Sequence, residues 1–212
     1  MAEEDFVRPR NKKDLHLREA VGAIHASRFV RKFARSKEPI TVEVIYEIHK
    51  EIFKKVLPEI AGKPREEEIK IWHSKYLPPH HSQISELMYD LGNELQEKLE
   101  NIKPLQLILK NEKEYMKGLD NLIRIVAWIH HKIVWVHPFS EGNGRTARLM
   151  ANLILEQYGL RTISTKNERE NKGAYFNALQ QIDEHGDYHP LIEMIVDGLI
   201  TRYEEIGGIR IQ

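Results

Sequence analysis

Hydrophobic residues recur along most of the chain at intervals of three and four positions. This spacing places them on one face of an α-helix, and that face is expected to be buried. Thr41 is a suitable N-cap for the first of these segments, and Pro190 suits the first turn of the last one. The expected helices cover residues 41–57, 84–99, 119–136, 147–158, 175–182 and 190–206.

The segment 119–136 is apolar on two faces. Leu122 and Val126 lie on one face, whereas Ile125 and Trp128 lie on another. A helix of this kind is covered by other elements on both sides, so we expect it at the centre of the fold. Charged residues and histidines interrupt the stretch, so it does not predict a membrane span.

One segment departs from the helical period. Residues 68–72 alternate between polar and apolar, and Tyr76-Leu77-Pro78-Pro79 follows after a short polar turn. Alternation with a period of two is typical of a strand, and the segment is too short to form a core sheet. The predicted fold is therefore all-α with a small β-hairpin flap over 68–79.

The composition narrows the classes of function. The 212 residues include 32 Lys and Arg, 32 Asp and Glu, and no cysteine. The balanced charge provides no overall field for a nucleic acid or an anionic membrane, and we expect neither as a partner. The absence of cysteine excludes disulfides, thiolate zinc sites and a cysteine nucleophile. The first ten residues contain no apolar run typical of a secretory signal, and we expect a cytoplasmic protein.

The charge is less even near the N-terminus. Residues 8–37 contain ten Lys and Arg but only Asp14 and Glu19 as acidic residues. We interpret residues 1–40 as a basic helical extension with a solvated face, and a docking surface for an acidic partner is the alternative. The segment lacks the interleaved aromatic residues that favour single-stranded nucleic acid.

The candidate chemistry lies in the segment HPFSEGNGRTAR, residues 137–148. Pro138 ends the preceding helix near His137, and the next helix begins around Asn143 or Gly144. Gly142 and Gly144 permit close approach of a ligand to the backbone. The first turn of that helix has unpaired N–H groups and the positive end of the dipole, which together suit a phosphate.

Four side chains in this segment add to the anion site. Arg145 and Arg148 lie three positions apart, so both face one side of the first turn and suit a polyphosphate. Glu141 can hold a divalent cation that bridges phosphate oxygens, and His137 can take up a proton. Each residue alone has an ordinary structural interpretation, but the twelve-residue group favours a nucleotide site.

This segment also resembles a known family. It matches the signature His-x-Phe-x-Asp/Glu-Gly-Asn-Gly-Arg-x-x-Arg of the Fic (filamentation induced by cAMP) family at every defined position. The flap IKIWHSKYLPP, the flanking helices and AYFNALQQIDEHGDYHPL are similar to the corresponding Fic segments. The resemblance covers roughly residues 39–200, and it implies a Fic-like catalytic domain over 41–212.

The resemblance implies a mainly helical protein adenylyltransferase, which transfers AMP from ATP to a hydroxyl of a target protein and releases pyrophosphate. His137 would be the general base, and Glu141 would ligate Mg²⁺ or Mn²⁺. The phosphates would be bound by the backbone and arginines of the motif, namely Gly142, Asn143, Gly144, Arg145 and Arg148.

Two further regions are implied by the same resemblance. The flap would pair with an extended segment of the target that carries a Ser, Thr or Tyr hydroxyl, and Ile71, Trp72 and His73 fit that place. The base pocket would involve Tyr175, together with Phe176 and Asp183. Trp72 and Tyr175 have core packing as their alternative, because Tyr175 falls on an apolar stripe.

Many Fic proteins carry an inhibitory Ser/Thr-x-x-x-Glu-Gly/Asn motif whose glutamate pairs with the second motif arginine, here Arg148. Ser27 has Arg31 where that glutamate is needed. Thr201 and Glu205 have the required spacing, although Ile206 replaces Gly or Asn, so Glu205 is the inhibitory candidate. A helix-end role for Glu205, a separate antitoxin chain, or no inhibition are the alternatives.

Other activities stay open at this level. A branch of the family transfers phosphate, usually with Lys where Gly144 stands, and other members use UTP or CDP-choline. A toxin-like Fic protein held inactive by a partner and a non-catalytic scaffold are further alternatives. The pairs His80-His81 and His130-His131 are interpreted as structural, because adjacent histidines do not share a helix face and no ligand set completes a metal site.

Overall fold

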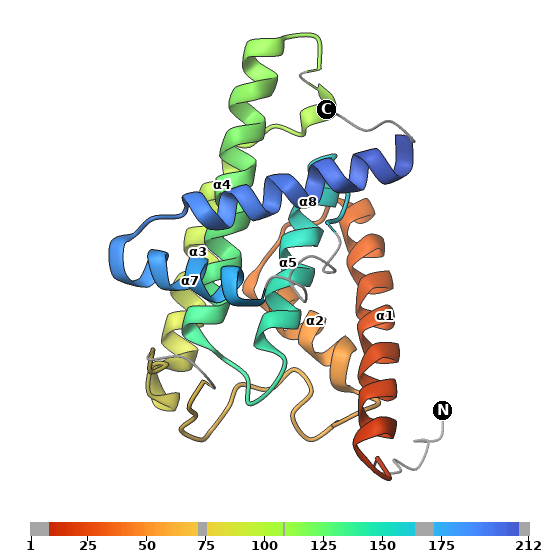
Figure 1. Cartoon of the computed structure of the whole chain (residues 1–212), viewed down its shortest axis with the longest axis vertical. Coiled ribbons are helices and arrows are strands. Elements are labelled where there is room, and N and C mark those ends of the chain that lie inside the picture. The colour runs from red at the N-terminus through yellow and green to blue at the C-terminus, as the bar shows by residue number, and fades with distance from the viewer. Residues whose placement is uncertain (1–8, 72–75, 108, 164–171, 208–212) are drawn as a thin grey trace.

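The structure is a computed structural model that describes residues 9–71, 76–107, 109–163 and 172–207 (Figure 1). These parts of the chain contain helices and no strand. The α-helices are α1 (Lys12–Ser36), α2 (Val42–Phe53), α3 (Ile84–Glu100), α4 (Glu112–Val136), α5 (Asn143–Gln157), α7 (Lys172–His185) and α8 (His189–Gly207), with short 3₁₀ helices η1 (His81–Gln83) and η2 (Leu105–Leu107).

Helices α4 and α5 pack against each other in the middle of the molecule. Helices α3 and α8 pack against α4, whereas α1 and α2 pack against α5 and against each other (Figure 1). The apolar residues of α4 are buried on several sides, among them Leu122, Ile125 and Val126. The predicted central position of this helix is therefore confirmed. None of the described helices has the length and apolar character needed to cross a membrane.

Helix α4 begins seven residues earlier than predicted. Asn111 is its N-cap, and the Asn111 side chain accepts a hydrogen bond from the Glu114 backbone N–H at 3.1 Å. The first two turns contain few buried side chains, so the apolar pattern did not reveal them. The cap and the acidic residues Glu112 and Glu114 stabilise this polar end.

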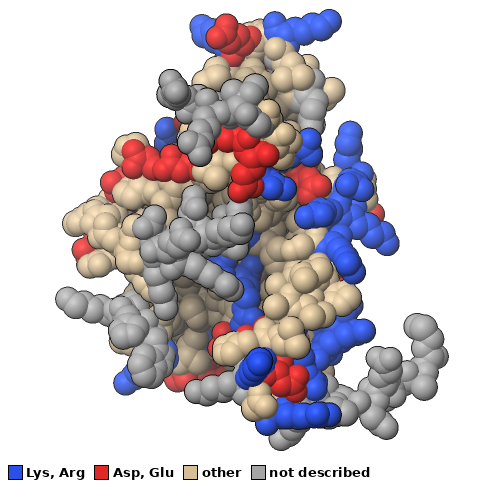
Figure 2. Space-filling model, turned by 45° about the vertical axis from the view of Figure 1, so that its right-hand side comes forward, with Lys and Arg blue, Asp and Glu red and all other residues tan. Residues whose placement is uncertain are grey.

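Helix α1 belongs to the same core as the rest of the chain. Its residues Ala26 and Val30 are buried in the central apolar cluster. Most of its basic residues are exposed, and Figure 2 shows Lys and Arg gathered along this part of the surface. The segment that we interpreted as an extension thus has a solvated basic face and a buried face.

The long connection between α2 and α3 differs from the predicted hairpin. No strand occurs in its described residues, and residues 72–75 lie outside the described part. The two ends of the segment are joined through a side chain instead. The buried Arg65 donates to the Glu67 carbonyl at 2.9 Å and to the Pro79 carbonyl. Pro78 and Pro79 have no N–H to donate to a strand ladder, which explains why the alternating pattern did not produce one here.

The close contact between α1 and α2 depends on Gly22. A Cβ atom at this position would lie 2.0 Å from the carbonyl oxygen of Ile52. The Gly22→Ala substitution should therefore lower the free energy of unfolding by about 1–3 kcal/mol, although alanine favours a helix more than glycine does. Urea unfolding followed by circular dichroism measures the effect.

Gly207→Ala is the matched control for Gly22→Ala, because nothing lies within 4 Å of a Cβ at Gly207 in α8. We expect it to be neutral or slightly stabilising. If Gly22→Ala were as stable as the wild type, α1 would not be packed on α2 as described.

Candidate functional site

The twelve-residue motif forms the predicted junction between two helices. Helix α4 ends at His137, which has left-handed backbone angles (φ 50°, ψ 55°) and donates its N–H to the Ile133 carbonyl at 3.0 Å. Helix α5 begins at Asn143, with Gly142 (φ 80°) as its N-cap. The N-terminal N–H groups of α5 and the ring of His137 are thus held at the two ends of one short loop.

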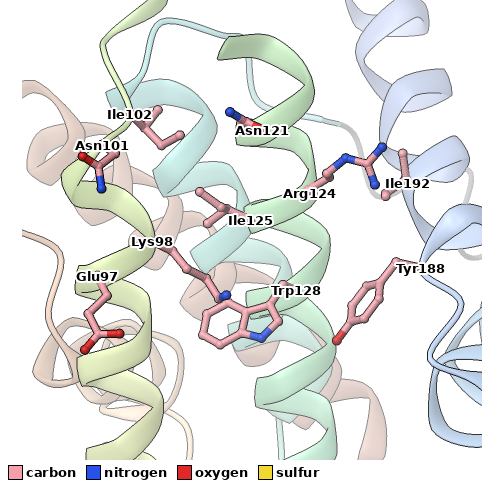
Figure 3. Close-up of a pocket in the computed structure, with 10 residues that line it drawn as sticks. All are labelled: Glu97, Lys98, Asn101, Ile102, Asn121, Arg124, Ile125, Trp128, Tyr188 and Ile192. Carbon is pink, nitrogen blue, oxygen red and sulfur yellow. The ribbon is translucent and has the colours of Figure 1, made fainter. Parts of the chain in front are cut away.

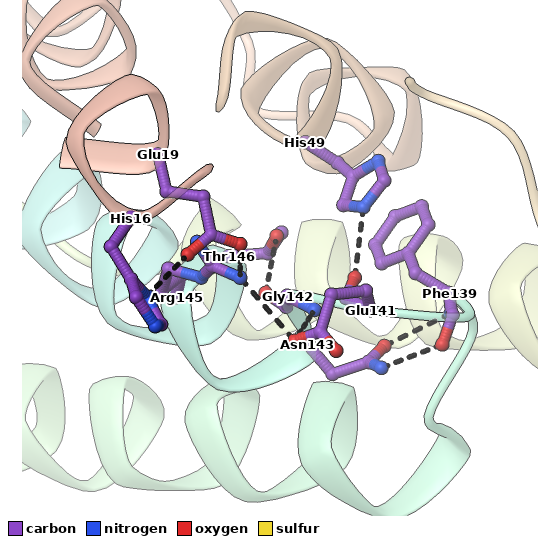
Figure 4. Close-up of polar contacts among 9 residues, drawn as sticks. All are labelled: His16, Glu19, His49, Phe139, Glu141, Gly142, Asn143, Arg145 and Thr146. Carbon is purple, nitrogen blue, oxygen red and sulfur yellow. Dashed lines mark hydrogen bonds and ion pairs between the residues drawn. The ribbon is translucent and has the colours of Figure 1, made fainter. Parts of the chain in front are cut away.

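The loop is closed by its own side chains (Figure 4). The Asn143 amide donates to the Phe139 carbonyl at 2.7 Å, and its oxygen accepts from the Phe139 N–H at 2.9 Å. The Thr146 hydroxyl donates to the Gly142 carbonyl at 3.1 Å. Because the Asn143 side chain is buried in these bonds, it shapes the loop, and its backbone remains at the start of α5.

A histidine from α2 packs against the loop. The ring of His49 stacks on Phe139, with 3.7 Å between ring centroids and 5° between planes. Phe53, also from α2, lies against the same loop, and a Cβ at Gly142 would lie 2.4 Å from its ring. Only glycine combines this close approach with a positive φ, so the packing of α2 requires the glycine at position 142.

The hydrogen bonds of His49 fix its tautomer. Nδ1 accepts from the Gly62 N–H at 2.9 Å, so the proton is on Nε2, which donates to the Glu141 carbonyl at 3.0 Å. Burial lowers the pKa of His49 to about 4, because the charged ring would lose its hydration. His49 is therefore neutral, and its ring connects the loop that contains Gly62 with the loop that contains Glu141.

His137 is oriented as a proton acceptor. Its Nδ1 lies 3.0 Å from the Val134 carbonyl oxygen, which can only accept, so the proton is on Nδ1. Nε2 is then the unprotonated nitrogen of the neutral ring. Burial lowers the pKa of His137, and the nearby Arg65 lowers it further, so the ring is neutral at physiological pH.

The backbone of this histidine is held by Arg65. The Arg65 Nε donates to the His137 carbonyl at 2.8 Å, and the Arg65 N–H donates to the Pro138 carbonyl at 2.8 Å. The same guanidinium binds the ends of the 68–79 segment, as described above. Arg65 therefore connects that segment to the motif loop through buried, charge-assisted hydrogen bonds.

A cavity of about 690 Å³ opens beside His137 and the start of α5. Helices α1, α4, α5 and α7 all contribute to its walls, and Figure 2 shows a hollow with Lys and Arg atoms at its floor. Its lining includes His137, Gly144, Arg145 and Arg148. The structure thus brings the predicted base and both motif arginines to one cavity.

Helix α1 adds further groups to the cavity that sequence reasoning did not assign to the site. Ser27 and Arg31 line it opposite the motif, so it contains a third arginine. The Glu19 carboxylate binds Arg145 Nη2 at 3.2 Å, and both side chains are mostly buried (Figure 4). The first motif arginine is therefore oriented by an acidic residue of α1.

Glu141 lies at the rim of the loop, and its side chain is 61% exposed. One of its oxygens accepts from the Gly142 N–H at 3.0 Å and from Arg145 at 3.3 Å. A single accessible carboxylate beside a phosphate site fits Mg²⁺, which is usually bound by one or two carboxylates, substrate phosphates and water.

Tyr175 lies between the cavity and the core. It lines the cavity and is buried, and its hydroxyl is 2.8 Å from Nε2 of His130. Phe176 also lines the cavity, whereas Asp183 instead binds His131 at 2.9 Å. Both histidines of this pair thus fasten α4 to α7, as their structural interpretation predicts.

The remaining predicted residues are distributed as follows. Ile71 lines the cavity, while Trp72 and His73 lie outside the described residues. Glu205 is not one of the residues that line the cavity. Its carboxylate accepts from Arg202 at 3.0 Å, one turn earlier in α8, and is 45% exposed. Glu205 thus forms a local ion pair within α8.

His49 and Arg65 are functional-site residues that the sequence analysis missed. His49 did carry a signal, because it falls on the apolar stripe of α2 between Ile45 and Phe53. A polar residue on such a stripe indicates a buried hydrogen-bonding role. Arg65 lies in an irregular segment without periodicity, so nothing local indicated its burial.

A second cavity, of about 520 Å³, lies away from the motif between α3, α4 and α8 (Figure 3). Trp128 forms part of its wall, and the Lys98 ammonium lies 4.9 Å from the centre of that ring. Tyr188 and Arg124 face it from the other side (Figure 3). No motif residue is among the residues that line it.

Comparisons with known proteins show the family of the chain. The sequence model of the Fic/DOC family matches residues 39–155. A protein of Nematostella vectensis named protein adenylyltransferase Fic is 28% identical over 185 residues, which cover 87% of this chain and 38% of that protein. The chain spans about a quarter to two fifths of the length of the curated relatives it matches.

Solved structures share the fold. Fic-1 from C. elegans (residues 134–508) superposes with a TM-score of 0.69 and 22% identity over 98% of this chain and 54% of that one. The BepC protein from Bartonella tribocorum, determined with bound AMPPNP, has a TM-score of 0.58 and 18% identity, with 92% and 94% covered. At these identities the likeness concerns the fold alone.

The buried neutral histidines predict a pH-dependent stability. The pKa is lowered to about 4 for His49 and to about 3 for His130, from about 6.5 in the unfolded chain. Below pH 6.5 the unfolded state binds more protons than the folded state, so the free energy of unfolding decreases as the pH is lowered. Together the two residues should lower it by roughly 2 kcal/mol between pH 6 and pH 5. Urea unfolding at several pH values measures this slope.

The His49→Gln variant isolates one of these contributions, because glutamine can donate and accept but does not titrate. We expect its slope in the same pH range to be shallower by roughly 1 kcal/mol per pH unit. His185→Gln makes the same change at an exposed position and should keep the wild-type slope. Equal slopes for all three proteins would contradict the assigned state of His49.

Proposed function

Because the chain belongs to the Fic/DOC family, we propose that it is a protein adenylyltransferase. It would transfer AMP from ATP to a hydroxyl side chain of a target protein and release pyrophosphate. The names of its curated relatives support this activity, as does the nucleotide analogue bound in BepC, a protein of the same fold.

One observation carries the proposal. The unprotonated Nε2 of His137 belongs to a residue that lines the same cavity as Arg145 and Arg148. A base beside an anion site at a helix N-terminus is the arrangement that phosphoryl transfer to a hydroxyl requires. Transfer of this kind depends on positioning and electrostatic stabilisation, which the fixed loop and the arginines provide.

The reaction follows from these positions. His137 Nε2 takes the proton of the target hydroxyl while the hydroxyl oxygen attacks the α-phosphorus of ATP. The bond from that phosphorus to the bridging oxygen of pyrophosphate breaks, and AMP remains ester-linked to the target. The left-handed turn and the Val134 hydrogen bond keep the basic nitrogen available for this step.

The nucleotide would be held by groups from several elements. Backbone N–H groups at Gly142, Asn143 and Gly144 start α5 and can bind phosphate oxygens. Arg145 and Arg148 would stabilise the charge that develops on the leaving pyrophosphate. Tyr175, on the α7 wall of the cavity, would contact the base.

Mg²⁺ or Mn²⁺ would be held by Glu141 together with phosphate oxygens. When bound, the cation neutralises phosphate charge and helps to orient the triphosphate. The Glu141 carboxylate is exposed and already contacts Arg145, which lines the cavity. Binding of a triphosphate and a cation would redistribute these contacts without a change of the loop backbone.

The target would dock along residues 68–79. Ile71 lies at the cavity, so an extended segment of the target bound there would present its hydroxyl near His137. Pairing through the main chain would allow several target sequences, because it reads the backbone more than the side chains.

Removal of the base tests the chemistry. The His137→Ala variant should lose transfer by about 10²- to 10⁴-fold while retaining ATP binding, because the arginines and the α5 N-terminus are unchanged. The measurement uses ATP labelled at the α-phosphate or at the γ-phosphate and follows label in the protein. Incorporation of α-label by the wild type is the expected result, whereas γ-label alone would identify a kinase.

Removal of the carboxylate tests the cation. We expect the Glu141→Ala variant to transfer AMP much more slowly than the wild type and to need more Mg²⁺ for half-maximal rate. Glu51 is an acidic residue of α2 bound to Lys54 rather than to the motif, and Glu51→Ala is the control. Full transfer in the presence of EDTA would contradict both the need for a cation and the proposed role of Glu141.

A further inference from the structure

The structure places a carboxylate beside the histidine pair His80-His81. The ligand atoms of Glu68, His80 and His81 all lie within 4.8 Å of one another. Glu68 Oε1 is 3.3 Å from His80 Nε2. The three residues enclose the segment 68–79, which runs along the connection between α2 and α3 (Figure 1).

From this arrangement we propose that Glu68, His80 and His81 form a transition-metal site that binds Zn²⁺ and joins the two ends of the 68–79 segment. The site is separate from Glu141 and does not rest on the proposed transfer activity. Its donors are two imidazoles and one carboxylate, a set that zinc binds with water as the fourth ligand.

The spacing of the donors fits the ion. Zinc binds histidine nitrogen at about 2.0–2.1 Å and carboxylate oxygen at about 2.0–2.2 Å, so tetrahedral ligands lie roughly 3.4 Å apart. The distance between Glu68 Oε1 and His80 Nε2 already agrees with this value. The side chains of both residues are 58% exposed, so rotation can bring in the third donor without disturbing the core.

The backbone explains why adjacent histidines can share one ion. His80 has an extended conformation (φ −57°, ψ 140°) and caps the short helix η1. The helical rule that separates neighbouring side chains therefore does not apply to this pair. The two rings lie 4.4 Å apart and on the same side of the turn, which the sequence analysis did not anticipate.

A neighbouring group fixes the orientation of one ligand. His80 Nδ1 lies 2.9 Å from the Ser82 hydroxyl. Nδ1 also accepts from the Ser82 backbone N–H at 3.3 Å, the bond by which His80 caps η1. When Nε2 binds an ion, Nδ1 carries the proton and donates to the Ser82 hydroxyl in place of this capping bond. A ligating histidine in proteins almost always donates its second ring N–H to such a partner, which fixes its orientation.

The ligands are also held together before any ion binds. The buried Arg65 donates to the carbonyls of Glu67 and Pro79, which immediately precede Glu68 and His80 in the chain. This clamp keeps the two ends of the segment close without the ion. Binding of Zn²⁺ therefore requires only adjustment of the side chains.

Titration of the untagged full chain with Zn²⁺ by isothermal calorimetry, with Mg²⁺ in excess, tests the site. We expect one equivalent of Zn²⁺ to bind the wild type. The Glu68→Gln and His81→Asn variants, which keep the size and polarity of the side chains, should each weaken binding at least tenfold. Circular dichroism checks that the fold is intact in both variants, because Glu68 is exposed and His81 is partly buried.

His189→Asn is the matched control, because His189 and Glu193 form an exposed pair at 3.4 Å that has no third ligand in the described part of the chain. It should bind Zn²⁺ as the wild type does. The proposal is overturned if the wild type binds no Zn²⁺, if both ligand variants bind it unchanged, or if the control loses it.

Discussion

The stack between Phe139 and the neutral ring of His49 is the contact on which the site depends. It attaches the loop between α4 and α5 to α2, so the base at one end and the helix N-terminus at the other keep one separation. The ring remains neutral because a buried imidazolium would be costly, and the two hydrogen bonds of His49 fix one tautomer. On this side, the loop is therefore held by a ring stack and by hydrogen bonds of a neutral side chain.

Arg65 connects the loop between α4 and α5 to the 68–79 segment, which lies outside the helical core. One guanidinium binds the carbonyl of His137 and the carbonyls at both ends of the 68–79 segment. Three carbonyl groups without helical partners are thereby satisfied by a single buried cation. The position of the motif loop and that of the 68–79 segment are consequently coupled through one side chain.

Much of the fold and of the cavity could be predicted from local patterns. The apolar spacing identified the helices from α2 onward, because a helix that must bury one face repeats every three to four residues. Pro138 and Gly142 fixed the helix–loop–helix junction, since proline and glycine restrict the backbone locally. His137, Arg145 and Arg148 were brought together because a single short loop connects them.

Contacts between residues distant in the sequence were decided only by the tertiary structure. The sequence by itself determined the helices from α2 onward and the position of the motif loop between two of them. It did not determine that Glu19 would bind Arg145, that Arg65 would bind the carbonyls of Glu67 and Pro79, or that Glu205 would pair with Arg202. The periodicity of one segment specifies which of its faces is buried. It does not specify which polar group of another segment will bind a polar side chain on that face. Such pairs form only when packing removes both groups from water and each must find a partner.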